Sequence, residues 1–310
     1  MKKEVVVYTL ISAGLIFLTG YMPVVGSILL FASVIPQLIL LYDDKYFSAV
    51  LSWLLVLGLI YGLKDSFFLY TYLTVFVVYA VSYRFILKKN KKPVQIILKA
   101  SVIWIALWVL WLVVTELILD INFIKESALF LKSGLAESVG GMYSLDLEIS
   151  HVAIIEKSFL NLVEFFKKSF FGFSIIWAVA GSYLVYSLLS FKRKSVKSPG
   201  SLLKFRLPEN MVWLLLIGIV LYLAGNKIGN YNIINLTGGN LSIVFLAGYM
   251  ITGMSLAVFF FEKINISGWL RNLFIVLIVL FLRGFWIFTA TGLADVWFDF
   301  RKIDKNEKSN

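Results

Sequence analysis

A few polar side chains interrupt the apolar segments of this sequence, and they are its candidates for chemistry. The strongest is Arg283, which stands midway along the apolar stretch 269–298. A charged side chain at the centre of a bilayer costs about 2.5–3.5 kcal/mol on insertion scales unless it pairs, reaches the interface or lines a wet cavity. We predict Glu116 and Asp295 as its acidic partners. Two roles stay open for Arg283: contact with a substrate, or a structural ion pair or turn between helices.

A second candidate site lies where Ser33, Pro36 and Gln37 fall within about one helical turn. Pro36 has no N–H, so we expect a kink and a freed carbonyl beside the Gln37 amide. These groups can hydrogen-bond a solute, and Tyr21 is a further residue that could reach it. The alternative is a structural kink in which Gln37 bonds a neighbouring helix.

Residues 226–240 are rich in asparagine and glycine, which favour turns and offer neutral donors and acceptors. We predict this stretch, which ends at Asn240, as the mouth of a neutral-solute site or as a plain external loop. His151 is the only histidine and there is no cysteine, so neither a Ser-His-Asp triad nor a histidine or thiolate metal site can be built. The sequence has no phosphate-binding glycine loop. We predict no enzyme activity, no metal and no cofactor.

The composition indicates which elements must hold these residues. Of 310 residues, 60% are hydrophobic and 15% are charged, whereas an ordinary soluble domain is about 25% charged. A soluble enzyme, a disordered protein and a fibrous repeat are therefore excluded. We predict an all-α fold, a polytopic membrane helix bundle.

Segments of about 20 apolar residues can cross a bilayer core about 30 Å thick. The last stretch, 269–298, is interpreted either as one tilted span or as a hairpin broken at Arg283-Gly284; we favour one span, and so about nine in total. The basic start before the first span resembles a signal peptide but has no small-residue cleavage site, so we predict a retained helix. The nine segments are 4–21, 24–42, 46–63, 66–87, 94–118, 169–191, 210–225, 241–261 and 270–292.

The net charge of +11 belongs to two short loops. Eleven of the 29 basic residues lie in the acid-free runs 84–92 and 192–206, and the other 18 balance the 18 acidic residues. Lys and Arg gather in cytoplasmic loops, so both runs are predicted inside and the N-terminus cytoplasmic. The charge therefore indicates topology rather than nucleic-acid binding, and the surrounding partner is the lipid bilayer.

The external segment 119–168 contains two apolar patterns with helical spacing, at 124–135 and 152–166, separated by Gly140-Gly141. Such spacing predicts an external pair of amphipathic helices. They would lie on the outer leaflet or cover the bundle as a lid.

Three stretches resemble the YybS-like family of uncharacterised bacterial membrane proteins. They are 21–45 (YMPVVGSILLFASVIPQLILLYDDK), 240–263 (NLSIVFLAGYMITGMSLAVFFFEK) and 292–302 (GLADVWFDFRK). That family looks distantly similar to the substrate-binding S subunits of energy-coupling-factor transporters, which are bundles of roughly six helices. Those subunits capture a vitamin or metal ion and rely on a coupling subunit and ATPases. The resemblance implies that residues 1–191, including the external segment, form an S-subunit-like bundle, followed by a three-span region at 207–310.

We therefore predict a multi-pass protein of the bacterial plasma membrane that binds a small solute and is energised by a coupling subunit and ATPases. The alternative is a non-transporting membrane scaffold or assembly factor that docks partner proteins. A solute binder predicts an enclosed polar cavity among the first six helices, whereas a scaffold predicts a solid bundle with an exposed apolar groove. The predicted substrate-binding residues are Tyr21, Ser33, Gln37, Glu116, Asn240 and Arg283.

Overall fold

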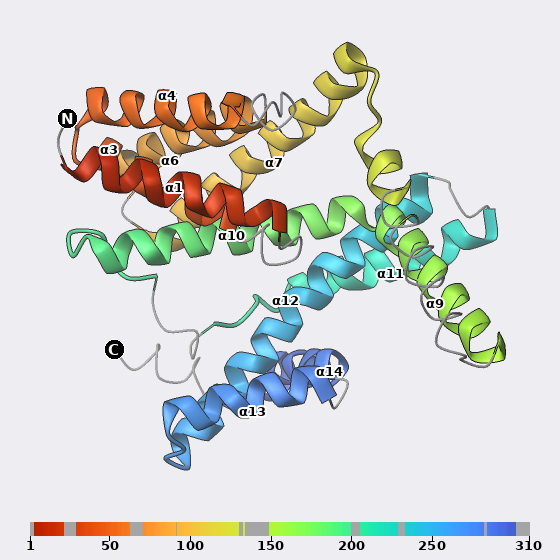
Figure 1. Cartoon of the computed structure of the whole chain (residues 1–310). Coiled ribbons are helices and arrows are strands. Elements are labelled where there is room, and N and C mark those ends of the chain that lie inside the picture. Colours follow the sequence, from red (N-terminus) through yellow and green to blue (C-terminus); the bar gives the residue numbers. More distant parts are fainter. Residues whose placement is uncertain are drawn as a thin grey trace. The chain divides into compact units, whose positions relative to one another are not determined.

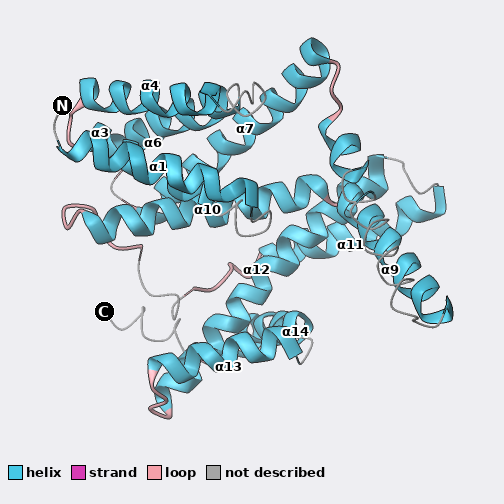
Figure 2. Cartoon of the chain, in the orientation of Figure 1, coloured by secondary structure: helices cyan, strands magenta, loops and turns pink. Residues whose placement is uncertain are grey.

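The described residues form helices joined by turns and loops, with no strand among them, which confirms the all-α prediction for this part of the chain (Figures 1 and 2). The chain divides into unit 1, residues 1–129 and 177–199, and unit 2, residues 130–176 and 200–310. The computed structural model describes residues 3–21, 29–62, 71–90, 92–129, 133, 149–199, 205–228, 233–281 and 284–301.

Unit 1 is a bundle of apolar helices around an aromatic core. Tyr72, Tyr79 and Tyr83 are fully buried, and Trp104 packs against Tyr79 and Phe31. Its helices are α1 (Lys3–Tyr21), α3 (Ile35–Tyr42), α4 (Tyr46–Gly62), the π-helix η1 (Tyr72–Val77) that continues as α6 (Val78–Lys89), α7 (Pro93–Leu119), and the second part of α10 (Phe170–Lys192).

The helix before α3 is interrupted where a kink was predicted. The apolar segment Leu29–Tyr42 has a turn at Val34, and α3 begins directly after it with Pro36 in its first turn. Proline is tolerated there because the first N–H groups of a helix have no intrahelical partner. The predicted kink coincides with this interruption, which lies two residues before Pro36.

Unit 2 is built around the long helix α12 (Ile233–Lys263), whose 31 residues extend about 46 Å. Helix α11 packs along its first half and α14 along its second half. The close approach depends on glycine: a Cβ at Gly238 would overlap the backbone of Tyr222, and one at Gly253 would overlap the carbonyl oxygen of Phe288. The other helices are α9 (Ile149–Lys168), the start of α10, α11 (Met211–Ile228), α13 (Gly268–Phe281) and α14 (Gly284–Phe298).

Four helices are long and apolar enough to cross a membrane, and three shorter apolar helices accompany them among the described residues. A membrane protein with several apolar helices is therefore supported, and nine spans stay a prediction. The four are Pro93–Ile118, Phe170–Lys192, Met211–Ile228 and Ile233–Lys263.

The structure describes all or part of three further predicted segments: the last span, the asparagine-rich stretch and the external helix pair. The predicted span 270–292 is covered by α13, described to Phe281, and α14, described from Gly284, and the predicted break at Arg283 lies outside the described residues. Residues 233–240, predicted as loop, are the first turns of α12, because their glycines pack against α11. Of the external amphipathic pair, α9 is described, and of the first helix residues 124–129 are helical, whereas 130–132, 134 and 135 lie outside the described residues.

Candidate functional site

The first candidate site is the side-chain amide of Gln37 inside unit 1. Gln37 is fully buried, and its Nε2 donates a hydrogen bond to the Tyr72 hydroxyl at 3.2 Å. Its Oε1 is buried without a hydrogen-bond partner among the described residues. A buried acceptor left unpaired costs about 1–3 kcal/mol. The site therefore offers a strong acceptor to any donor that enters it.

Two local irregularities hold this site. Gln37 follows the break at Val34 and the proline after it, and Tyr72 is the first residue of the π-helix η1. Short π-helical segments recur at functional sites because they interrupt the α-helical register and re-aim side chains. Tyr72 was not predicted from the sequence, where nothing distinguishes it among 15 tyrosines.

The Ser33 hydroxyl is used within its own segment. Its Oγ donates to the carbonyl oxygen of Leu30 at 2.7 Å, and its carbonyl accepts a hydrogen bond from Ser12 Oγ at 2.9 Å. Ser33 thus ties α1 to the segment that precedes α3. Ser33 is fully buried, and so is Gln37, which follows four residues later in the sequence.

Two surface cavities of unit 1 lie away from Gln37. One, of about 390 Å³, lies between α1 and α4 and has apolar walls that include Leu10 and Leu59. The other, of about 610 Å³, is lined by residues at the start of α4, among them Asp44 and Lys45, and by Val5 of α1. Gln37 is fully buried and lines neither of these cavities, so neither is the enclosed polar cavity that we predicted for a solute binder.

The other predicted site residues do not join this group in the described structure. Glu116 is exposed near the end of α7, where it accepts a hydrogen bond from Asn122 at 3.0 Å. Asn240, in unit 2, donates to the carbonyl oxygens of Lys168 and Leu236 and accepts from the Gly172 N–H at 2.6 Å. Its amide therefore joins α12 to the junction of α9 and α10. The side chain of Tyr21 and all of Arg283 lie outside the described residues.

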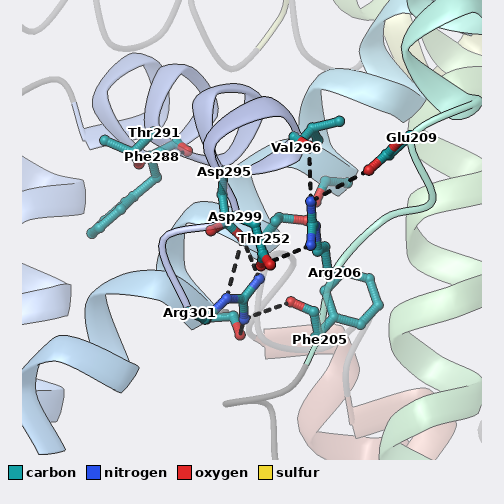
Figure 3. A network of polar contacts seen from close by, with 12 residues as sticks. Phe205, Arg206, Glu209, Thr252, Phe288, Thr291, Asp295, Val296, Asp299 and Arg301 are labelled. Carbon is teal, nitrogen blue, oxygen red and sulfur yellow. Dashed lines mark hydrogen bonds and ion pairs between the residues drawn. The ribbon is translucent and has the colours of Figure 1, made fainter. Parts of the chain in front are cut away.

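Unit 2 contains a fully buried ion pair that the sequence analysis missed (Figure 3). Both Nε and Nη2 of Arg301 donate to Asp295 Oδ2, at 3.1 and 2.5 Å. Arg301 Nη1 also donates to the carbonyl oxygen of Phe205 and to Ser255 Oγ, at 3.1 and 2.8 Å. Asp295 was predicted to pair with Arg283, whereas its partner here is Arg301, which follows the last apolar segment and gave no signal.

A second arginine, Arg206, joins this network from the segment that precedes α11. Arg206 donates to Asp299 Oδ1 at 3.0 Å and to the Val296 carbonyl oxygen at 2.8 Å (Figure 3). A positive charge near a helix C-terminus is favourable, and it satisfies a carbonyl in the last turn of α14. The end of α14 is thereby fixed to the segment that precedes α11.

A further cluster of charges lies at the end of unit 1 where α3 ends. Arg193 and Lys45 lie beside Asp43, while Lys88 and Arg84 hydrogen-bond Asp44. Hydrogen bonds from Lys88 and then Arg84 lower the pKa of Asp44 to about 2, so its carboxylate stays charged near neutral pH. Within the described ranges, no three His, Cys, Asp or Glu side chains gather as a metal site would require.

Most of the chain matches one known protein family. A model of a family of predicted membrane proteins, DUF2232, matches residues 10–296. The chain belongs to this family. The DUF2232 match includes the buried groups of both units, from Ser12 to Asp295. No curated protein and no solved structure matched the chain. The DUF2232 assignment supports an integral membrane protein in contact with the lipid bilayer.

Proposed function

We propose that unit 1 of this DUF2232 protein binds a small neutral solute at Gln37 and Tyr72, and that partner chains energise the movement of that solute across a bacterial plasma membrane. The observation that carries the proposal is the unpaired Oε1 of the fully buried Gln37. An unpaired acceptor inside an apolar bundle costs free energy. A hydrogen bond from a solute N–H or O–H would remove this cost.

The surroundings of Gln37 favour a neutral ligand with an apolar face. Its partner Tyr72 stacks on Phe76 with ring centroids 5.8 Å apart, and Phe76 contacts Trp104 edge-on. These rings supply apolar contact area, and the amide and phenol supply uncharged hydrogen-bonding groups. The described side chains close over Gln37, so binding requires a second, open conformation of unit 1. The S-subunit resemblance supports the same role, with a coupling subunit and ATPases as partners, and the basic loops favour a cytoplasmic N-terminus.

The solute proposal is tested by ligand-dependent melting of the purified protein in lipid nanodiscs. A panel of neutral solutes that carry N–H or O–H donors is screened, and a ligand at about 100 times its Kd should stabilise the protein by about 2.7 kcal/mol. Gln37→Leu should abolish this shift, whereas Gln95→Leu, at an exposed glutamine of α7, should leave it unchanged. Equal shifts in the wild type and Gln37→Leu would contradict the proposal.

The scaffold function is the second candidate, and the apolar groove between α1 and α4 favours it. Leu10, Leu54 and Leu59 are more than half exposed there, and no atom approaches the position of a Cβ at Gly58. Small residues permit close helix packing in membranes, so this groove could receive a partner helix. Purification at native expression in mild detergent separates the two: ATPases and a coupling subunit support transport, and their absence alongside other bound proteins supports a scaffold.

A further inference from the structure

Three helices of unit 1 end beside one pair of adjacent acids. Asp43 and Asp44 form the turn between α3 and α4, and each of them pairs with basic residues at the end of a different helix. Asp43 pairs with Arg193, which directly follows α10, and Asp44 pairs with Arg84 and Lys88 in the last turns of α6. This cluster, called here the clasp, therefore joins the ends of α3, α6 and α10 and consists of Asp43, Asp44, Arg84, Lys88 and Arg193.

The contacts within the clasp are specific in geometry. Arg193 holds Asp43 with two parallel bonds, from Nε to Oδ1 at 3.0 Å and from Nη2 to Oδ2. Arg84 donates from Nε to the Leu41 carbonyl oxygen at 2.6 Å and from Nη2 to Asp44 Oδ1, with its guanidinium above the Tyr46 ring. Two-pronged arginine contacts fix orientation as well as distance. The clasp thus determines how α6 and α10 lie against the end of α3.

The acids of the clasp are in contact with solvent, since the side chains of Asp44 and Asp43 are 58% and 22% exposed. Arg193 is also partly exposed, whereas Arg84 is buried. Water can replace the partners of the exposed groups at modest cost. The Asp295–Arg301 pair of unit 2 has no such freedom, because both side chains are completely buried. Among the ion pairs of the described residues, those of the clasp combine two-pronged geometry with access to water.

Two of the three helices joined by the clasp carry the Gln37 site. Gln37 lies six residues before Asp43 along α3, about 9 Å, and Tyr72 begins the helical segment that carries Arg84. We propose that the clasp is the gate of unit 1: its ion pairs close this end of the bundle, and their separation admits water or solute to Gln37. That a solute passes this gate rests on the function proposed above, whereas the opening of the gate does not depend on that function.

Single-cysteine labelling tests the gate, because the chain has no native cysteine. Ser33→Cys places a fully buried thiol four residues before Gln37. Its reaction with a membrane-impermeant maleimide is measured in nanodiscs, which leave both faces open to the reagent. Asp43→Asn with Asp44→Asn removes the pairs with Arg193, Arg84 and Lys88. It should raise the labelling rate at least about fivefold, the factor for loss of one partly exposed ion pair in a two-state equilibrium.

The matched control is Asp120→Asn, at an exposed acid beyond the end of α7, which should leave the labelling rate unchanged. Asp43→Arg alone should raise labelling, and Asp43→Arg combined with Arg193→Asp should lower it again by re-forming the pair with reversed charges. An unchanged rate in a monodisperse double-asparagine variant, or an equal rise in the control, would overturn the gate. If labelling rises but no solute shifts the melting of the wild type, the gate stands and the solute-binding function fails.

Discussion

The two units hold their helices together in different ways. In unit 1, bulky aromatic side chains fill the space between helices, and Tyr72, Tyr79 and Tyr83 are all fully buried. In unit 2, glycines at positions such as 238 and 253 allow helix backbones to touch. Their ion pairs differ too: the acids Asp43 and Asp44 of unit 1 reach solvent, whereas both side chains of Asp295–Arg301 are buried. The difference supports the gate that we propose in unit 1, and it predicts that changes to the packing of unit 2 cost more.

The largest effect should come from Arg301→Leu, which leaves Asp295 charged and buried without its partner. Breaking a buried pair in this way costs about 3–5 kcal/mol, so unit 2 should melt at a clearly lower temperature. Limited proteolysis of the protein in nanodiscs, followed during heating, would report the loss. The matched control is Arg271→Leu, whose partner Glu262 is 45% exposed; a surface pair contributes about 1 kcal/mol or less. Equal losses in both variants would refute the distinction between buried and exposed pairs.

The glycine contacts predict a smaller, graded effect. A Cβ at Gly253 would overlap the Phe288 carbonyl oxygen, so Gly253→Ala should separate α12 from α14 and cost about 1–3 kcal/mol. In unit 1, no atom lies near the Cβ position of Gly58, so Gly58→Ala should be neutral or slightly stabilising. Thermal melting of both variants, measured side by side, checks the comparison. A loss at Gly58 as large as that at Gly253 would contradict it.

The smallest effect concerns pH and the clasp. The pKa of Asp44 is lowered from 3.8 to about 2, chiefly by Lys88 and Arg84, so the folded chain favours the charged carboxylate. This contribution is complete above the ordinary pKa and is lost as the pH falls from about 4 toward 2. The melting temperature should therefore be insensitive to pH near neutrality and should fall below about pH 4, less steeply in Asp44→Asn, which lacks this contribution at every pH. A wild-type loss centred near pH 6 would show that another group controls the clasp.

Local patterns predicted those parts of the fold that depend on near neighbours in the chain. The break before Pro36 follows from a missing N–H, and the amphipathic helix α9 follows from apolar residues at helical spacing. The burial of Gln37 follows from its place in an apolar segment. Its partner Tyr72, 35 residues later, could not be predicted, because that contact depends on how α3 packs against η1.

For the charged residues, too, the sequence predicts one part and the packing of distant helices decides the other. The positions of the eleven excess basic residues could be read directly, and they predicted two loops on one side of a membrane. Their partners could not be predicted: Arg84 binds an acid 40 residues earlier, and Arg193 one 150 residues earlier. Arg301 gave no signal at all, since in sequence it belongs to a polar segment with mixed charges.

Composition and spacing by themselves determined that this is an all-helical membrane protein and where most of its apolar helices begin and end, because helix formation and insertion depend on neighbouring residues. Only the tertiary structure decided which polar groups meet: Gln37 with Tyr72, Asp43 with Arg193, and Asp295 with Arg301. Such pairs depend on the packing of helices far apart in the chain, and the shape of whole helix faces controls that packing. The candidate sites of this protein are therefore properties of its packing, and its membrane class is a property of its composition.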